Sequence, residues 1–264
     1  MRLNDLHLKI TDLLNRPFID NPKLESKIFI CKVLKISTEE FLLQRNVNEV
    51  DKNDEKKIFA LARRRISGKS CAELVGEKEF YGMKFEVSQD VLIPRSDTEL
   101  LIDIFLENCK DEGYKKVLEI GSGSGIIPIV IASKTDNLVI DSIDISSKTV
   151  KIARKNMILN NISPDKIKFF RKNALNFKPK YCYDFIVSNP PYIATDDTKR
   201  LLKSKTIDDP QIALDGGKDG LKFYRIIKIL GDKYLKNGGK IILEHGFDQK
   251  DDLISRSEER RVGK

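Results

Sequence analysis

The residue types best suited to chemistry stand in Asn189-Pro190-Pro191-Tyr192, which follows the apolar run Asp184–Ser188. Proline fixes φ and has no backbone N–H, so carbonyl groups near the two prolines stay free to accept hydrogen bonds. The asparagine adds a side-chain carbonyl, and the tyrosine adds a flat aromatic face. The motif therefore predicts a site for a planar NH2 group whose two hydrogens are accepted by carbonyls of Asn189 and Pro190.

A planar NH2 nitrogen is a poor nucleophile because its lone pair is delocalised, as in any amide. Two fixed acceptors would draw it towards tetrahedral geometry and expose its lone pair to an electrophile. Positioning and electrostatics suffice for this, so we predict no acid–base pair and no covalent nucleophile. An isolated N-P-P-Y could also be only the proline-rich end of a strand. The predicted catalytic residues are Asn189, Pro190 and Tyr192.

A glycine-rich turn, G-S-G-S-G at Gly121–Gly125, lies between an apolar run and an amphipathic segment. Glycines let the backbone pass close to a ligand, and helix N-termini offer free N–H groups. The G-x-G-x-G spacing and the preceding acidic residue, Glu119, distinguish this turn from a G-x-G-x-x-G dinucleotide fingerprint. The alternative is a purely structural connection between a strand and a helix.

Two further strand ends could contact a cofactor bound at the glycine-rich turn. Asp144 ends the second apolar strand, where a carboxylate can accept hydrogen bonds from ribose hydroxyls; Asp141 is the weaker candidate. Asn173 and Ala174 follow the third strand and could contact an adenine ring, although a polar residue there is also a common turn former. The predicted cofactor-binding residues are Glu119, Gly121, Ser122, Gly123, Ser124, Gly125, Asp144, Asn173, Ala174 and Asn189.

Strand–helix alternation after Gly113 places these motifs on a sheet. The expected strands are Lys116–Ile120, Leu138–Ile143, Ile167–Arg171, Asp184–Ser188 and Lys240–Glu244. The expected helices are Ile126–Ser133, Ser147–Asn160 and Leu221–Tyr234. Such alternation indicates an α/β fold with a mostly parallel sheet covered on both faces.

The chain from Met1 to about Cys71 instead shows helical periodicity, which predicts a small helical bundle. Asn21-Pro22 marks one helix start, and the pair Ser37 and Glu40 forms a capping-box pattern. A further helix is expected from about Asn53 to Ile66. The apolar face of the helix after Pro22 is expected to consist of Leu24, Ile28, Cys31 and Leu34.

Together these residues resemble the class I S-adenosylmethionine-dependent methyltransferases with an N-P-P-Y motif, which modify either nucleic-acid adenine N6 or protein glutamine. Leu92–Glu99 resembles the L-I-P-R-P-D-T-E segment of the peptide chain release factor glutamine methyltransferase family, with Ser96 replacing a proline. Ribosomal-protein glutamine methyltransferases carry P-R-S-P-I-A-E there, so Asp97-Thr98 favours the release-factor family. Asp209–Leu221 resembles that family's E-P-x-x-A-L-x-G-G-x-D-G-L segment, with Asp209 replacing a glutamate.

The resemblance implies a Rossmann-like class I methyltransferase domain with S-adenosylmethionine as cofactor. It implies transfer of a methyl group to the side-chain N5 of the glutamine in the G-G-Q motif of peptide chain release factors. The substrate-binding residues carried over are Arg95, Asn189, Pro190, Pro191 and Tyr192. Arg95 and Glu99 could shape the substrate pocket or brace the domain junction, and a surface salt bridge is the alternative.

The expected domains follow from these boundaries. Residues 1–76 form a helical substrate-recognition domain, residues 77–99 a hairpin linker around Gly82, and residues 100–255 the methyltransferase domain. Residues 256–264 read R-S-E-E-R-R-V-G-K, which back-translates to a sequence resembling a common sequencing adapter, so we predict an artefactual tail. The family's fold usually closes with a C-terminal hairpin, which we expect to be missing from this chain.

Composition narrows the remaining possibilities. No apolar run approaches the ~20 residues of a membrane span, so we expect a cytoplasmic protein, and we expect a monomer. The four cysteines and two histidines do not cluster, which argues against a metal site. The net charge of +8 permits an acidic partner, but no insert for recognising a flipped base is evident, so no nucleic-acid substrate is expected. The alternatives are adenine-N6 methylation of DNA or RNA, glutamine methylation of a ribosomal protein, and a nucleic-acid-binding module using the basic run Lys56–Lys69.

Overall fold

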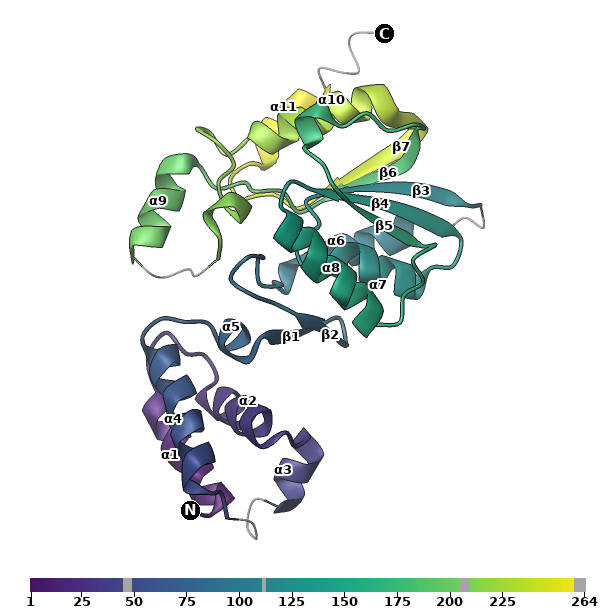
Figure 1. Cartoon of the computed structure of the whole chain (residues 1–264). Coiled ribbons are helices and arrows are strands. Elements are labelled where there is room, and N and C mark those ends of the chain that lie inside the picture. Colours follow the sequence, from purple (N-terminus) through teal and green to yellow (C-terminus); the bar gives the residue numbers. More distant parts are fainter. Residues whose placement is uncertain (45–48, 111–112, 205–208, 259–264) are drawn as a thin grey trace. The chain divides into compact units, whose positions relative to one another are not determined.

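The computed structural model describes residues 1–44, 49–110, 113–204 and 209–258, and its contacts divide the chain into two compact units (Figure 1). The first unit is Met1–Gly76, and the second comprises Glu77–Ser204 and the residues from Asp209 onwards. Each unit has buried apolar clusters of its own, as separately packed domains require. Of the predicted tail, residues 259–264 lie outside the described residues.

The first unit is helical in its described part. Its helices are α1 (Leu3–Leu14), α2 (Pro22–Leu34), α3 (Thr38–Gln44), α4 (Lys52–Ile66) and α5 (Cys71–Val75). Asn21 Oδ1 accepts a hydrogen bond from Leu24 N at 3.0 Å, which caps α2. The capping box before α3 is confirmed, because Ser37 N donates to Glu40 Oε2 at 2.7 Å and Glu40 N donates to Ser37 Oγ at 3.0 Å.

The predicted apolar face of α2 is only partly borne out, because three of its four residues pack against the core and Leu24 does not. The fully buried residues of this helix are Ser26, Phe29 and Ile30, whereas Leu24 is exposed. The other residues of the predicted face, which are Ile28, Cys31 and Leu34, are only half-buried. The reason is that α2 packs against α1, α3, α4 and α5, so apolar residues occur around most of its circumference and their spacing does not select one face.

The second unit begins with the predicted hairpin. Strands β1 (Glu77–Phe80) and β2 (Met83–Glu86) are antiparallel, and Tyr81 and Gly82 form the turn with φ of 54° and 72°. Tyr81 N donates to Glu99 Oε1 at 3.2 Å. The hairpin is thereby attached to helix α6 (Asp97–Asn108), and Glu99 braces this attachment.

The sheet of the second unit is parallel at each of its described pairings. Its strands are β3 (Lys115–Ile120), β4 (Leu138–Asp144), β5 (Ile167–Arg171), β6 (Tyr183–Ser188) and β7 (Leu235–Leu243), in the order β5-β4-β3-β6-β7. The Rossmann-like fold and all five expected strands are confirmed. The last strand begins at Leu235 instead of Lys240 and ends before Glu244.

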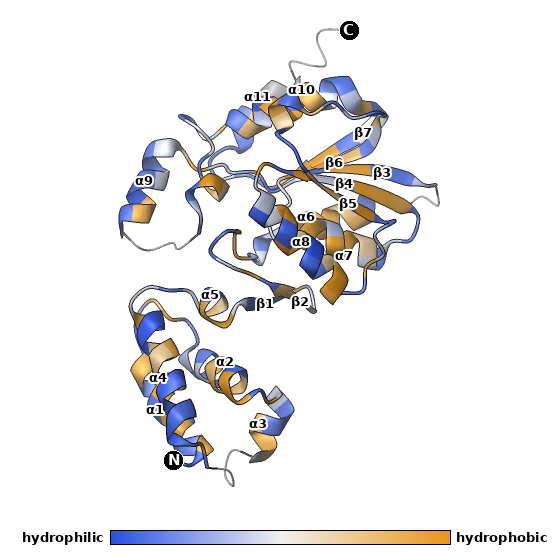
Figure 2. Cartoon of the chain, viewed as in Figure 1, coloured by the Kyte–Doolittle hydropathy of each residue, from blue (hydrophilic) through white to orange (hydrophobic). Residues whose placement is uncertain are grey.

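Helices cover both faces of this sheet (Figure 1). Helices α6, α7 (Ile126–Lys134) and α8 (Ser147–Leu159) lie on one face, and α10 (Lys222–Tyr234) lies on the other. Side chains of β3 alternate between the two layers, with Val117 facing α6–α8 and Leu118 facing α10. Figure 2 shows the apolar colour along the central strands β4 and β6 and along α7. This burial makes the strand ends rigid supports for the loops that follow them.

Shorter elements complete the second unit. They are η1 (Ala174–Asn176), α9 (Thr195–Ser204), η2 (Gln211–Ala213) and α11 (Lys250–Glu258). Within the described ranges, no helix combines the length and the apolar character needed to cross a membrane.

Candidate active site

The carboxyl ends of the parallel strands bring the sequence motifs together at one edge of the sheet. The glycine turn follows β3, Asp144 ends β4, Asn173 follows β5 and Asn189 follows β6. A cavity at this edge is lined from all four strand ends. The predicted site residues that line it are Arg95, Gly121, Ser122, Gly123, Ser124, Asp144, Asn173, Ala174, Asn189, Pro190 and Pro191. The other predicted residues, Glu119, Gly125 and Tyr192, do not line the cavity.

The glycine turn brings main-chain atoms to the cavity in a conformation that other residues rarely adopt. Gly121, Gly123 and Gly125 have φ of 85°, 53° and 84°. A Cβ at Gly123 would meet no other atom within 4 Å, so this position borders open space. A Cβ at Gly125 would lie 3.0 Å from Ile129 Cδ1 and 3.1 Å from Ala153 Cβ. Gly123 therefore leaves room for a ligand, whereas Gly125 lets α8 pack closely on the start of α7.

Asp144 is held at the cavity by main-chain donors. Its Oδ1 accepts from Ser146 N at 2.8 Å, and its Oδ2 accepts from Gly123 N at 3.3 Å. Burial raises the pKa of this carboxyl group, and the main-chain hydrogen bonds oppose the rise. A carboxylate fixed at the end of β4 can accept hydrogen bonds from the hydroxyl groups of a ribose.

Glu119 is fully buried behind the glycine turn. Its Oε2 accepts a short hydrogen bond from Ser142 Oγ, which lies 2.6 Å from Ser122 Oγ. Its Oε1 has no hydrogen-bond partner among the described residues. Burial raises the pKa of Glu119 well above its usual value, and the hydrogen bond from Ser142 opposes the rise. In this position Glu119 supports the turn through two serine hydroxyls.

Asn173 and Ala174 both line the cavity. Asn173 Oδ1 accepts from Leu175 N at 3.0 Å, which is the turn-forming role that the sequence left open. Ile145 and Leu175 also line the cavity, although their side chains remain 50% and 62% exposed. Exposed apolar side chains beside Asp144 suit the flat faces of an aromatic base.

The segment after β6 is anchored on both sides of the two prolines. Ser188 Oγ donates to Ile120 O at 2.6 Å, which joins the ends of β6 and β3. Gln249 Nε2 donates to Tyr192 O at 2.8 Å. The loop 214–217 lies alongside, where Gly216 N donates to Ile193 O at 2.7 Å. These bonds fix the backbone that carries the predicted acceptors.

The predicted acceptors themselves remain available. Among the described residues, none donates a hydrogen bond to Pro190 O or to Asn189 Oδ1. Asn189 Nδ2 donates to Thr98 Oγ1 at 3.1 Å, so the nitrogen is the end of the amide that is already bonded. Asn189 and Pro190 both line the cavity. The arrangement therefore offers two oxygen acceptors, which is what an NH2 group needs.

Arg95 lines the cavity and forms an ion pair with Asp209. The Asp209 side chain is only 1% exposed, whereas that of Arg95 is 50% exposed. Asp209 also accepts from Ile93 N at 3.0 Å. The pair therefore joins the two segments Leu92–Glu99 and Asp209–Leu221 at the cavity, and it is more than a surface salt bridge.

Some cavity residues were not predicted from the sequence. Thr98, Ile145, Lys172 and Phe223 line the cavity together with the predicted residues. Thr98 stands inside the segment Leu92–Glu99, so the family resemblance could have identified it. Phe223 lies on α10, far along the chain, and no local pattern marks it.

The chain is similar to known methyltransferases over most of its length. The Methyltransferase small domain family matches residues 96–219. A "Release factor glutamine methyltransferase" of Fusobacterium nucleatum is 36% identical over 252 residues, which cover 94% of this chain and 70% of that protein. A protein of the same name from Clostridium botulinum is 34% identical over 95% of this chain and 88% of that protein. A "Bifunctional methyltransferase" of Rickettsia felis is 34% identical, and the match covers 92% of this chain and 51% of that protein.

Solved structures show a likeness of fold. The hMettl16 catalytic domain in complex with MAT2A 3'UTR hairpin 1 matches 89% of this chain and 82% of that chain, with a TM-score of 0.53. The two sequences are 17% identical, so the likeness concerns the fold alone.

Proposed function

We propose that this chain, which belongs to the release factor glutamine methyltransferase family, transfers a methyl group from S-adenosylmethionine to a glutamine side-chain amide of peptide chain release factors. The target that the sequence resemblance implies is N5 of the glutamine in the G-G-Q motif. One observation supports transfer to a planar NH2 nitrogen most directly, and the family relationship favours a glutamine amide as that group. Asn189 and Pro190 line the cavity, and no described residue donates a hydrogen bond to Asn189 Oδ1 or to Pro190 O.

The cavity fits S-adenosylmethionine by the chemistry of its lining. Asp144 would accept hydrogen bonds from the ribose hydroxyls, and the open side of Gly123 would leave room for the amino-acid part. Ala174 and the exposed apolar side chains of Ile145 and Leu175 would border the adenine ring. When bound, the cofactor supplies an electrophilic methyl group on a sulfonium.

The residues of the chain would act on the substrate nitrogen by binding its two hydrogens. Asn189 Oδ1 would accept one and Pro190 O the other, which weakens the conjugation of the nitrogen lone pair with the amide carbonyl. The prolines hold these acceptors in fixed positions because their φ angles cannot vary. Tyr192 is half-buried beside them, and burial raises the pKa of its hydroxyl, followed by the negative charges of Glu244 and Asp97. Tyr192 therefore stays neutral and contributes a ring face and not a charge.

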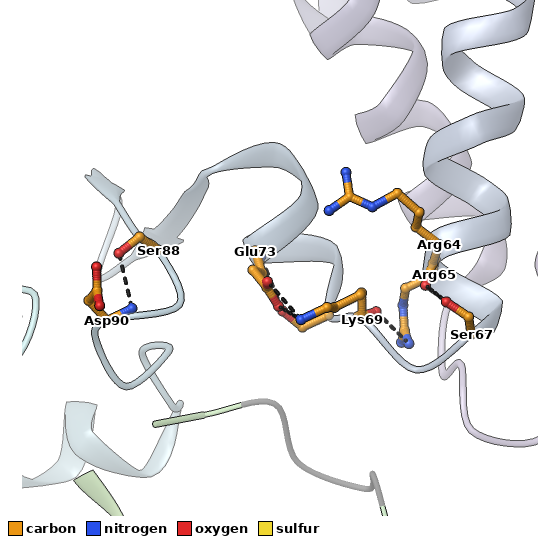
Figure 3. Close-up of polar contacts among 8 residues, drawn as sticks. Arg64, Arg65, Ser67, Lys69, Glu73, Ser88 and Asp90 are labelled. Carbon is orange, nitrogen blue, oxygen red and sulfur yellow. Dashed lines mark hydrogen bonds and ion pairs between the residues drawn. The ribbon is translucent and has the colours of Figure 1, made fainter. Parts of the chain in front are cut away.

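The nucleic-acid alternatives have weaker support. Some residues of the basic run Lys56–Lys69 form hydrogen bonds and ion pairs within the first unit. Arg65 donates to Glu25 at 2.7 Å and 3.1 Å. It also donates to Lys69 O at 3.3 Å, as Figure 3 shows. Lys69 pairs with Glu73 at 3.1 Å in the same view. A charge run with internal partners supports the structural interpretation of this helix end.

The roles of the two units remain part of the proposal. Residues 1–76 would help to grip the release factor, residues 77–99 would link the units, and residues 100–255 would carry out the transfer. Because release factors act in translation, we place the enzyme in the cytoplasm, and we expect a monomer. Light scattering coupled to size-exclusion chromatography measures the oligomeric state.

The experiment that tests the proposal is transfer of labelled methyl from S-adenosylmethionine to a purified release factor. A release factor whose G-G-Q glutamine is replaced serves as the control substrate. We expect label on the intact factor alone, and we expect Asn189→Ala to abolish transfer. Label on both factors would refute the target, and label on adenine-containing nucleic acid in place of protein would refute the substrate class.

A further inference from the structure

The Asn189 side chain can act as an acceptor only in one of its two orientations. An asparagine amide carries an oxygen that accepts and a nitrogen that donates, and rotation by 180° about χ2 exchanges them. With the oxygen towards the substrate, the amide can bind an NH2 group. With the nitrogen there, two donors would face each other and the site would repel its substrate.

A buried threonine holds the nitrogen end. Thr98 is 1% exposed in the first turn of α6, and its Oγ1 accepts from Asn189 Nδ2 at 3.1 Å. A hydroxyl has one hydrogen, so it can accept from Asn189 while donating that hydrogen elsewhere. The hydrogen goes to Glu244 Oε2, at 2.7 Å from Thr98 Oγ1.

Glu244 determines which groups donate and which accept in this series of hydrogen bonds. It directly follows β7, and its main-chain N donates to Ser188 O at 3.1 Å, one residue before Asn189. An ionised carboxylate accepts and cannot donate. Thr98 must then donate to Glu244, which leaves its lone pairs for Asn189 Nδ2 and turns Asn189 Oδ1 towards the cavity.

We propose that Thr98 and Glu244 are positioning residues that fix which end of the Asn189 amide faces the substrate nitrogen. The inference rests on the proposed function, because it assigns Asn189 Oδ1 to a hydrogen of the substrate. Thr98 and Glu244 are 146 residues apart in the sequence and converge on the end of β6. The two residues act on the orientation of Asn189 and do not take up the proton that the substrate nitrogen loses when it gains the methyl group.

The ionised state of Glu244 is opposed by its surroundings. Burial raises the pKa of its carboxyl group, and the charge of Asp97 on α6 adds to the rise. The hydrogen bonds from Thr98 and Asn189 and the neighbouring His245 oppose it. From the other packed elements, Tyr192 faces this carboxyl group, and Tyr224 on α10 donates its hydroxyl to Glu244 O at 3.2 Å.

The raised pKa of Glu244 predicts opposite effects of pH on activity and on stability. As pH falls through the raised pKa, Glu244 gains a proton and can donate to Thr98, so the amide of Asn189 loses its fixed orientation and activity falls. The folded state binds that proton more tightly than the unfolded chain, so the same protonation favours folding. An acidic limb in the activity profile without loss of folded protein would therefore distinguish positioning from unfolding.

The test compares matched variants of the full chain in the methyl-transfer assay. Thr98→Val keeps the shape and removes the hydroxyl, and we expect kcat to fall by about 10- to 100-fold. Thr98→Ser keeps the hydroxyl and should recover most of the activity. Thr198→Val is the control, because Thr198 is also fully buried but its hydroxyl has no hydrogen-bond partner among the described residues. Its activity should match that of the original chain.

Glu244→Gln is the second variant, since Thr98→Val could also weaken folding. It should lower kcat, remove the acidic limb of the activity profile and leave thermal stability at pH 7 unchanged or higher. Cofactor affinity should be unchanged in Glu244→Gln, because Glu244 does not line the cavity. Full kcat in Thr98→Val, or an acidic limb that persists in Glu244→Gln, would overturn the positioning role. If the original chain labels no release factor, the proposed function fails instead, so the two failures are distinct.

Discussion

Replacing Gly220 by alanine should displace the backbone of the segment Asn189–Tyr192. Gly220 has φ of 73°, and a Cβ there would overlap with Tyr192 O and lie 2.6 Å from Gln249 Nε2. These two atoms form the hydrogen bond that anchors Tyr192, at 2.8 Å. The methyl group would therefore press directly on the backbone that carries the acceptors.

Gly220→Ala should lower the free energy of unfolding for two reasons. Alanine in the left-handed region costs about 1–2 kcal/mol, and forcing a methyl group into a packed site costs about 1–3 kcal/mol. Together they should lower the free energy of unfolding by about 2–5 kcal/mol. Gly238 provides the matched control, because its φ is 76° and a Cβ there would meet nothing within 4 Å. Gly238→Ala should therefore cost only about 1–2 kcal/mol.

Urea unfolding gives the two free energies, and the methyl-transfer assay gives kcat. We expect Gly220→Ala to be less stable than Gly238→Ala and to lose activity even at temperatures where it remains folded. Cofactor affinity should change little, because Gly220 does not line the cavity. Equal stability of the two variants, with normal kcat in both, would refute the idea that this loop supports Tyr192.

Two further predictions concern buried carboxyl groups. Asp144→Asn should weaken S-adenosylmethionine binding by about tenfold, because a neutral amide is a poorer acceptor for ribose hydroxyls. Since burial raises the pKa of Asp144, calorimetry on the original chain should show affinity falling as pH is lowered through that raised pKa. Burial also raises the pKa of Glu119, so its contribution to stability is present below the ordinary pKa of a glutamate and is lost as pH rises through the raised value. Glu119→Gln should remove this loss in urea unfolding at a series of pH values, and an unchanged pH dependence would refute the assignment.

Motifs that are contiguous in the sequence were predictable. The glycine turn and Asn189–Tyr192 each need only a strand, a turn and a few side chains, and the strand–helix alternation fixes where the strands end. Because parallel strands end at one edge, the meeting of Gly123, Asp144 and Asn189 also followed from the sequence.

Contacts between distant segments were not predictable from local pattern. The hydrogen bond between Thr98 and Glu244 spans 146 residues, and the bond between Gln249 and Tyr192 spans 57. Each of these hydrogen bonds depends on the path of a loop across the end of the sheet. Hydrophobic periodicity in the sequence does not predict that path. The apolar face of α2 was predicted only in part for a related reason, since a helix with neighbours on several sides has apolar residues on several sides.

The site combines two kinds of support, and they should respond differently to mutation. Gly220 and Gly125 act through packing, so a larger side chain there should reduce stability and activity together. Glu244 acts through charge, and burial makes that charge unfavourable for folding. Its neutral isostere should therefore keep or raise stability while lowering activity. A role in packing would be served as well by glutamine, so a fall in kcat of Glu244→Gln without loss of stability would assign Glu244 to the orientation of Asn189.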